Sequence, residues 1–313
     1  MMPGEIPIFI YHGHDDNVFT VAWSPDSTSI ASGSRDKTVH IWNVRTGKLS
    51  RTYRGHSSSL LSVAWSPSGN FIASGDTSGV VQVWEANTGR NIVSYHGHKR
   101  FVRSISWSPD GSLIASGGDF GDNTVQIWAA LSGKLVYTHS QQYRIFGVSW
   151  SPDGKRIASG SFDGSVQTWD AMTGINVVRY RSLTSPIYAT AWSPNGAYIA
   201  SGGEDTTIQV WEATSGESVC MYKGHNNSVK SLAWSPDSIY IASGSDDRSV
   251  QIWEAASGTS TMAYSGHTRW VRTVAWSYDG QYIASASDET VHVWQPHALT
   301  HLSKLFSTPS QSP

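Results

Sequence analysis

The chain has 313 residues but only one cysteine, Cys220. A single cysteine cannot form an internal disulfide, which excludes a small secreted module held together by disulfides. Long apolar runs are also missing, since none approaches the ~18 residues of a membrane-spanning helix. The apolar segment 6–11 has neither a basic region before it nor a small-residue cleavage site, so it does not read as a signal peptide. We therefore expect a cytoplasmic protein with no membrane partner.

Charged residues are scarce as well, at 15% of the chain, and the formal net charge is −2. A chain without an overall basic field is a poor default candidate for binding the phosphate backbone of nucleic acid. No glycine-rich loop leads into a helix, so a nucleotide site has little support. Nucleic acid is therefore an unfavoured partner, and we expect no cofactor.

Tryptophan, by contrast, is abundant and periodic: the chain has 15. One series lies in Ala-Trp-Ser or Ser-Trp-Ser at spacings of 42, 42, 43, 42, 42 and 42 residues, namely Trp23, Trp65, Trp107, Trp150, Trp192, Trp234 and Trp276. A second series keeps nearly the same period, namely Trp42, Trp84, Trp128, Trp169, Trp211, Trp253 and Trp294. Only Trp270 belongs to neither series. This self-similarity indicates seven structural repeats.

Each repeat reads as four short strands separated by turns, and no helix is indicated. In the first repeat the strands are predicted at 18–23, 29–34, 38–42 and 49–53. Ser-Pro-Asp-Gly and Thr-Gly or Ser-Gly segments between the apolar runs supply the turn chemistry. One four-stranded sheet of this size cannot bury both faces, whereas seven packed around an axis can. The sequence therefore predicts an all-β fold, a seven-bladed β-propeller of four-stranded antiparallel blades.

The repeat also resembles that of the WD-repeat family, over roughly 6–294. The family signature is a Gly-His before the first strand and a Trp, often followed by Asp, at the end of the third. Gly-His occurs at Gly13-His14, Gly55-His56, Gly97-His98, Gly224-His225 and Gly266-His267. Repeats four and five have Ser140-Gln141 and Ser182-Leu183 instead, and Trp169-Asp170 is the one literal Trp-Asp. The resemblance implies an assembly scaffold in which the first strand of each blade is innermost.

The domain boundaries follow from the repeats. We expect one propeller over residues 5–295, with repeats near 14–55, 56–97, 98–140, 141–182, 183–224, 225–266, and 267–294 completed by 5–13. The seventh repeat stops after its third strand, so the N-terminal strand is expected to close the ring as the missing fourth. Residues 296–313, rich in Ser, Thr, His and Pro, are predicted to be a disordered tail.

By the same resemblance, a His, a Ser, an Asp and a Trp form a hydrogen-bonded tetrad within a blade. The expected sets are His14, Ser34, Asp36 and Trp42; His225, Ser245, Asp247 and Trp253; and His267, Ser287, Asp288 and Trp294. Blades three to five depart from the pattern and are expected to depend more on packing. A hydrolase triad uses the same residue types, but a set repeated at one register suits a structural network. We therefore assign no catalytic residue.

Twelve histidines raise the question of a metal site. Five of them belong to the Gly-His series and are spread around the predicted ring, whereas metal ligands must converge on one point. His40 and His292 stand two residues before a strand-ending Trp, where the other repeats have Gln, and we expect them on a solvated strand face. No metal site is therefore expected.

A candidate partner-binding rim lies on the propeller face that carries the Gly-His loops. The residues there vary from repeat to repeat and are rich in the aromatic and arginine side chains typical of interface hot spots. The predicted rim residues are Phe19, Arg35, Phe101, Arg103, Arg144, Phe146, Phe162, Tyr188, Lys230, Trp270 and Arg272. Another possibility is that these rings only plug the channel mouth.

The sequence thus predicts a non-enzymatic, monomeric scaffold that binds a protein or peptide at this rim. One alternative is a propeller enzyme, a hydrolase or lyase with a site in the central channel. It would need a unique converging set of titratable residues, and none is evident. The other is nucleic-acid binding through the rim arginines, which would have to outweigh Glu204 and Asp246.

Overall fold

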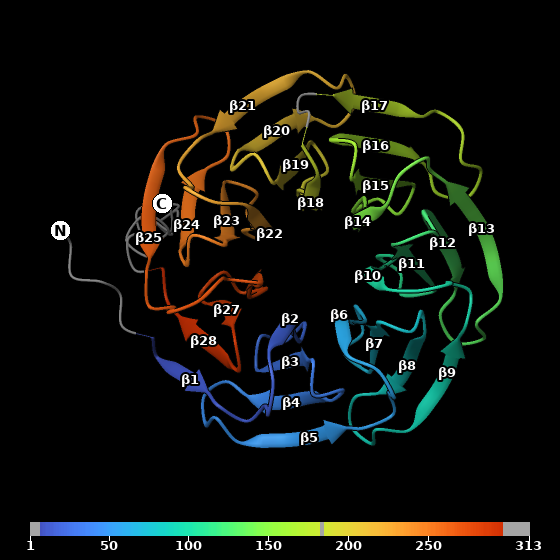
Figure 1. The fold of residues 1–313 in the computed structure, drawn as a ribbon, viewed down its shortest axis with the longest axis vertical. Helices are drawn as coiled ribbons and strands as arrows, with labels where there is room; N and C mark the ends of the chain where they lie inside the picture. The colour runs from blue at the N-terminus through green and yellow to red at the C-terminus, as the bar shows by residue number, and fades with distance from the viewer. Residues whose placement is uncertain (1–6, 182–184, 297–313) are drawn as a thin grey trace, which may run out of the picture.

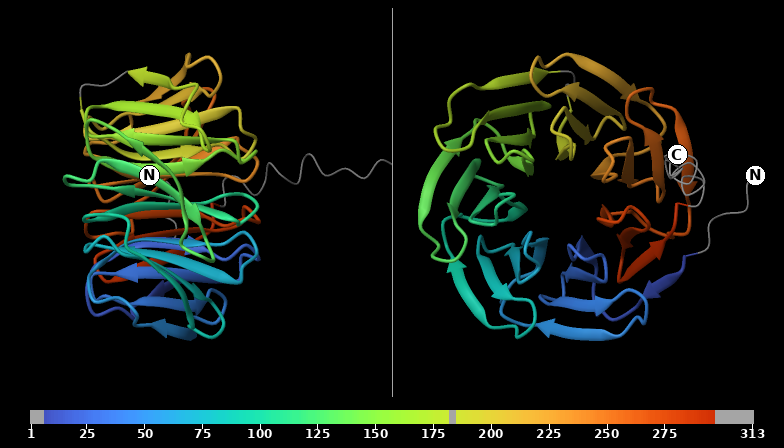
Figure 2. Two further views of the ribbon diagram at one scale, coloured as in Figure 1. Left: turned by 90° about the vertical axis from the view of Figure 1, so that its right-hand side faces the viewer. Right: turned by 180° about the vertical axis from the view of Figure 1, so that it is seen from behind.

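The computed structural model describes residues 7–181 and 185–296, which form a ring of seven four-stranded antiparallel sheets (Figure 1). The sheets stand side by side around a central opening, and the first strand of each blade is innermost (Figure 2). The described residues contain no helix, and so none that is long and apolar enough to cross a bilayer. The predicted all-β, seven-bladed propeller is confirmed.

The blades follow one another along the chain. Blades one to three consist of β2 (Val18–Trp23), β3 (Ser29–Ser34), β4 (Val39–Asn43) and β5 (Leu49–Tyr53); β6 (Leu60–Trp65), β7 (Phe71–Asp76), β8 (Val81–Glu85) and β9 (Asn91–Tyr95); and β10 (Val102–Trp107), β11 (Leu113–Gly118), β12 (Thr124–Ala129) and β13 (Leu135–Ser140). Blades four to six consist of β14 (Ile145–Trp150), β15 (Arg156–Ser161), β16 (Ser165–Asp170) and β17 (Val178–Arg181); β18 (Ile187–Trp192), β19 (Tyr198–Gly203), β20 (Ile208–Glu212) and β21 (Ser218–Tyr222); and β22 (Val229–Trp234), β23 (Tyr240–Ser245), β24 (Val250–Glu254) and β25 (Ser260–Tyr264). Blade seven consists of β26 (Thr273–Trp276), β27 (Ile283–Ser287), β28 (Thr290–Trp294) and β1 (Phe9–Tyr11).

The second strand of each blade is buried almost throughout, because neighbouring blades cover both of its faces. Glycine in the Ala-Ser-Gly segment of this strand permits the close approach. A Cβ on Gly75 would lie 2.8 Å from a methyl group of Val102 in the next blade, and a Cβ on Gly244 would lie equally close to Val271. The repeated glycine therefore sets the spacing between blades.

Aromatic stacks join one blade to the next. The tryptophan that ends each third strand is buried, and a tyrosine from the fourth strand of the preceding blade stacks on it in most blades. Tyr53 lies 4.2 Å from Trp84 and Tyr95 lies 4.4 Å from Trp128, measured between ring centroids. The second tryptophan series is thus periodic because each copy fills the same interblade position.

The ring is closed by the N-terminal strand, as predicted. β1 pairs antiparallel with β28, and Tyr11 lies opposite Val291. The Tyr11 ring then stacks on Trp42 of blade one at 4.7 Å, repeating the stack seen between other blades. Blade seven therefore takes its outer strand from the other end of the described chain. Most of the predicted tail, residues 297–313, lies outside the described residues.

Candidate functional site: hydrogen-bonded tetrads and the channel rim

Blade one forms a complete tetrad, but the predicted serine is wrong in each of the three expected sets. In blade one, His14 Nε2 is bonded to Ser32 Oγ at 2.9 Å, and Trp42 Nε1 donates to the same oxygen at 3.3 Å. His14 Nδ1 is bonded to Asp36 Oδ2 at 2.8 Å. Ser34 instead donates to the backbone carbonyl of Asp16. Side chains two residues apart in a strand share a face, so the sequence pattern admitted both serines and distance selects the earlier one.

The same two-residue correction holds in blades six and seven. His225 is bonded to Ser243 and not to Ser245, and His267 to Ser285 and not to Ser287. Asp247 bonds His225 at 2.8 Å as expected, whereas the indole nitrogen of Trp253 is buried without a hydrogen-bond partner. The blade six network therefore joins three of the four predicted residue types.

Blades two and three contain complete tetrads, which the sequence interpretation missed. Blade two uses His56, Ser74, Asp76 and Trp84, and blade three uses His98, Ser116, Asp122 and Trp128. The expectation that blade three depends mainly on packing is thus wrong. Asp76 ends β7 at the position of Ser34 in blade one, and its carboxylate reaches His56 Nδ1 from there at 2.8 Å.

Blade seven lacks the acidic member of its tetrad, so the assignment of Asp288 is wrong. The loop between β27 and β28 is one residue short, and Asp288 turns outward with a positive φ of 49°. Its carboxylate lies 3.8 Å from Arg269 Nε. His267 Nδ1 is left buried without a partner. In blade four the histidine itself is replaced, and Gln141 Nε2 donates to Ser159 Oγ at 2.6 Å.

His40 and His292 are buried, at 5% and 7% exposed, so the predicted solvated strand face is wrong. Each imidazole stacks on the tetrad histidine of its blade: His40 lies 3.9 Å from His14, and His292 lies 4.1 Å from His267. Each also bonds a tyrosine hydroxyl, of Tyr11 at 2.9 Å or Tyr264 at 2.7 Å. Histidine thus replaces the glutamine that bonds this tyrosine in blades two, three and six.

The histidine stacks shift the protonation of these residues. Burial lowers the pKa of His40 to about 4, and the neighbouring charge of His14 adds to the effect. Burial likewise lowers the pKa of His267 to about 3 and that of His292 to about 4. Asp36 is also buried, which opposes ionisation, but hydrogen bonds from His14 and Thr38 hold its pKa below the usual range. His40, His267 and His292 are therefore neutral near pH 7.

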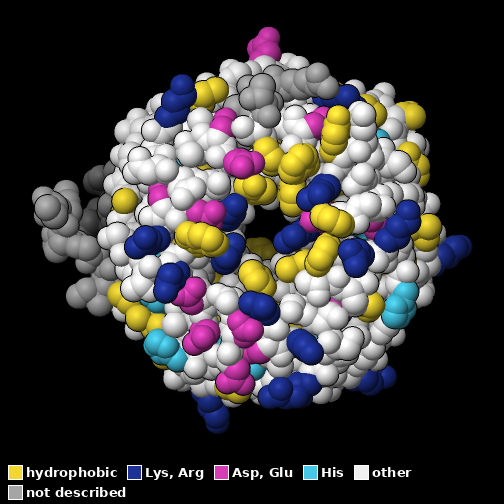
Figure 3. Space-filling model, viewed as in Figure 1, with side chains coloured by type: hydrophobic (Ala, Val, Ile, Leu, Met, Phe, Trp, Pro, Cys, Tyr) yellow, Lys and Arg dark blue, Asp and Glu magenta, His cyan; other side chains and the backbone are white. Residues whose placement is uncertain are grey.

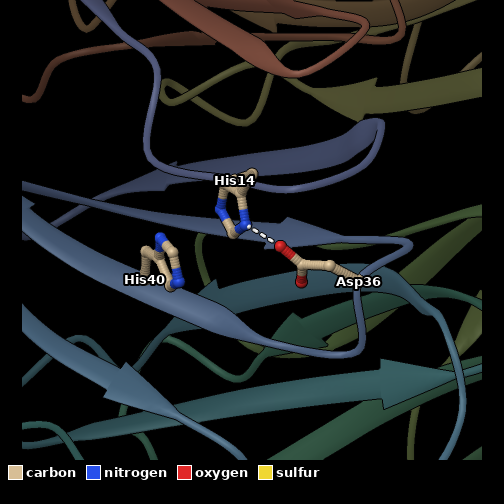
Figure 4. Close-up of side chains that lie close together, drawn as sticks. All are labelled: His14, Asp36 and His40. Atoms are coloured by element: carbon tan, nitrogen blue, oxygen red, sulfur yellow. Dashed lines mark hydrogen bonds and ion pairs between the residues drawn. The ribbon is translucent and has the colours of Figure 1, made fainter.

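His14, Asp36 and His40 bring three side chains that could each ligate a metal close together (Figure 4). Both nitrogens of His14 already have hydrogen-bond partners. The two imidazole planes are inclined by only 12°, and the lone pairs of a ring lie in its plane, so stacked rings do not direct them to a common point. The tetrad and the Tyr11 bond account for the whole cluster.

The mouth of the central channel brings together residues from all seven blades. A cavity of about 330 Å³ is lined by Phe19, Leu61, Arg103, Phe146, Tyr188, Lys230 and Arg272. Six of these seven are predicted rim residues, and the seventh is Leu61. Lys and Arg side chains lie among hydrophobic ones around the opening (Figure 3). We call these seven residues the channel mouth.

The remaining predicted rim residues surround the mouth. Phe101 lies 5.4 Å from the Arg103 guanidinium in blade three, and in blade four the Arg144 guanidinium lies 5.3 Å from the Phe162 ring. Trp270 lies beside Arg272, whose guanidinium is 4.9 Å from the indole. Arg35 stands apart: it is exposed, lies 3.7 Å from Asp16 and does not line the cavity.

Two residues at the mouth were missed from the sequence, Asp119 and Phe120. Asp119 is buried and accepts a hydrogen bond from Arg103 Nε at 2.9 Å, while Arg144 Nε lies 3.8 Å away. Phe120 places its ring 4.3 Å from the Arg144 guanidinium. Both lie where blade three is two residues longer than blades one and two. That insertion is visible in the sequence and could have identified them.

Trp270 is half exposed, at 50%, in a rim where most other aromatic rings are partly buried. The first strand of blade seven begins at Thr273, two residues later than the equivalent position in the other blades, so Trp270 lies in a loop. Arg272 extends from this loop toward Phe19 of blade one, at 5.7 Å from its ring. The indole, the guanidinium and the phenyl ring thus meet across the ring closure.

The architecture defines a class of protein, a seven-bladed propeller with repeated His-Ser-Asp-Trp networks, which are complete in blades one to three. The residues that line its channel mouth differ from blade to blade. A family model described as the first beta-propeller of IFT122 matches residues 60–212. A model of the WD domain, G-beta repeat, matches residues 5–43, 216–254 and 258–295. The chain belongs to the WD-repeat family.

Individual relatives match over segments about one repeat long. Eukaryotic translation initiation factor 3 subunit I of Neurospora crassa is 44% identical over 43 residues, 14% of this chain and 12% of the relative. Protein HIRA of Zea mays is 48% identical over 40 residues, 13% of this chain and 4% of the relative. A probable cytosolic iron-sulfur protein assembly protein CIAO1 homolog of Chlamydomonas reinhardtii is 49% identical over 47 residues, 15% of this chain and 13% of the relative. The alignments thus cover a small part of each relative's length.

Proposed function

We propose that this protein is a non-enzymatic scaffold that binds a protein or peptide at the rim around the channel mouth. The observation that carries the proposal is Trp270, a large apolar side chain that is half exposed beside Arg272. Packing symmetry does not account for it, because no other repeat has tryptophan at this position. Aromatic and arginine side chains placed together supply both contact area and directed hydrogen bonds to a partner.

The burial of the tetrad histidines supports a structural role for them over a catalytic one. A Ser-His-Asp triad also has both ring nitrogens of its histidine hydrogen-bonded, so access to a substrate, and not bonding, distinguishes a catalytic set from a structural one. In blades one, two, three and six, both ring nitrogens of the tetrad histidine are bonded within the network. These histidines are also buried, so a substrate has no direct access to them.

The charge balance supports a protein partner over nucleic acid. Arg103 and Arg144 share Asp119, and Lys230 lies 3.2 Å from Asp246. Asp119 and Asp246 thus offset half of the positive charge of Arg103, Arg144, Lys230 and Arg272, whereas binding a phosphate backbone favours a larger surplus of positive charge. A binding affinity that fell steeply with salt would favour the nucleic-acid alternative.

A scaffold role also suits what the relatives' names describe, since one is a subunit of an initiation factor and another an assembly protein. We further propose that the chain is a cytoplasmic monomer, consistent with its single cysteine.

Affinity capture from a lysate, read by mass spectrometry, tests the proposed function. Trp270→Ala should lose the specific partners of the wild-type ring. Tyr278→Ala is the matched control, because Tyr278 is also an exposed aromatic of blade seven, at 56%, but lies at the opposite end of the channel. Loss of the same partners from both variants, or from neither, would contradict binding at the rim.

A further inference from the structure

The basic residues of the rim are not equivalent. Arg35 lies near Asp16, Arg103 and Arg144 near Asp119, and Lys230 near Asp246. Arg272 differs: in residues 7–181 and 185–296 no carboxylate lies within ion-pair distance of its guanidinium. Its guanidinium carbon lies over the rings of Trp270 and Phe19, at 4.9 Å and 5.7 Å from their centroids.

An arginine held between two rings is oriented but not neutralised. Cation–π contacts engage the flat face of the guanidinium and leave the N–H groups at its edge free to donate. The five guanidinium N–H donors match the two oxygens of a carboxylate in a bidentate arrangement. The side of the mouth formed by blades seven and one therefore offers one unmatched positive charge.

The residues around Arg272 supply an apolar surface that the same partner could contact. The indole of Trp270 presents apolar area beside the guanidinium, and the cavity continues toward Phe146 and Tyr188, which lie 5.2 Å apart. A group bound to the free edge of Arg272 would thus place its neighbouring side chain on an aromatic surface.

Resting on the proposed function, we infer that the partner presents a linear segment with a carboxylate side chain within about two residues of a large apolar side chain. The carboxylate pairs with Arg272, and the apolar side chain packs on Trp270. A carboxylate is favoured over a phosphate group because, in the part of the chain that the structure describes, Arg272 is the one channel-mouth cation without a carboxylate partner, whereas a phosphate group carries nearly two negative charges at pH 7.

Selection from a displayed library of random linear peptides tests this inference. We expect clones that bind the wild-type ring and depend on Trp270 to share an acidic residue close to Trp, Phe, Leu or Ile. A synthetic peptide of that sequence should bind Arg272→Glu about tenfold or more weakly. The same peptide with Lys in place of its acidic residue should bind Arg272→Glu better than it binds wild type.

Arg35→Glu provides the matched control, because it makes the same charge change on the same face at a residue outside the cavity. It should leave the affinity of the acidic peptide within about twofold, and thermal melting should show that both variants are folded. The inference would be overturned if the Trp270-dependent peptides shared no acidic residue, or if Arg272→Glu and Arg35→Glu lost the same affinity for the acidic peptide. Either result would leave the proposed function intact.

Phosphopeptide variants complete the test. If only a phosphoserine peptide bound, and the matching glutamate peptide did not, the carboxylate assignment would be wrong. A library that yielded no Trp270-dependent clone would contradict the inference and the proposed function together.

Discussion

Blades two and seven share most of the same network and differ at two positions, which makes them a natural internal comparison. In both, a buried histidine bonds a serine at 2.7 Å, and the indole nitrogen of the strand-ending tryptophan donates to that serine. Blade two adds Asp76 on the other ring nitrogen of His56 and has Gln82 beside it. Blade seven has no acidic partner for His267 and has His292 in place of the glutamine.

The difference teaches that the histidine can take its acidic partner from the end of the second strand as well as from the loop that follows it. In blade two Asp76 is the last residue of β7 and bonds the imidazole from there, whereas blade seven has Ser287 at that position. In blade seven the loop is one residue shorter, and Asp288 lies on the surface near Arg269. The blade with the weaker internal network is also the one that exposes Trp270 at the mouth. The residue that we propose to bind a partner thus lies in the blade with the fewer network hydrogen bonds of the two.

Removing the N-terminal strand should have the largest effect, because blade seven depends on it. Deletion of residues 1–11 exposes the edge of β28 and removes the Tyr11 ring from Trp42. We expect a large fall in melting temperature and aggregation, measured by calorimetry and size-exclusion chromatography. A truncated protein that melts like wild type and elutes as a monomer would refute closure by β1 as a stabilising feature.

Removing the tetrad histidine should separate the two blades. His56→Ala removes the imidazole that bonds both Asp76 Oδ2, on a nearly buried carboxylate, and Ser74 Oγ, and should cost about 3 kcal/mol of unfolding free energy. His267→Ala loses one bonded partner and should cost about 1 kcal/mol less. Equal losses in urea unfolding would show that the aspartate contributes nothing.

The corrected serine assignment gives a smaller effect. Ser74→Ala removes the oxygen that bonds both His56 and Trp84, and should cost about 1 to 2 kcal/mol. In blade one, Ser32→Ala should likewise cost more than Ser34→Ala, whose hydroxyl bonds only loop backbone groups. The reverse order in blade one would restore the assignment made from the sequence.

Lowering the pH should destabilise blade seven more than blade two. The pKa of His267 is lowered to about 3 and that of His292 to about 4, against about 6.5 in an unfolded chain, so the unfolded state binds more protons below about pH 6.5. The stability from these histidines is complete above that pH and is lost as the pH falls toward about 4. His292→Gln, which installs the residue of blade two, should flatten this loss in melting curves. An unchanged pH dependence would contradict the role of the stacked pair.

The sequence was sufficient for the fold because the period is carried by residues that fill identical places in every blade. The tryptophans that end the third strands are buried between blades, so their spacing reports the blade length directly. The missing fourth strand after Trp294 likewise predicted closure by β1. Both inferences rest on local patterns repeated many times.

The network and the rim could be predicted only in part, because they depend on which of several similar side chains come close. Ser32 and Ser34 lie on one strand face, and only the position of His14 distinguishes them. Asp119 was missed because it lies in an insertion without a counterpart in other repeats. The burial of His40 depends on Tyr11, which is distant in sequence.

Calorimetric titration of the captured partner, or of a selected peptide, into wild type, Trp270→Ala and Tyr278→Ala tests the central claim most directly. The account predicts that Trp270→Ala weakens binding by about 2 kcal/mol, roughly thirtyfold, with little change in melting temperature, and that Tyr278→Ala binds like wild type. Unchanged affinity for Trp270→Ala, or an equal loss in Tyr278→Ala, would contradict a binding site at the channel mouth.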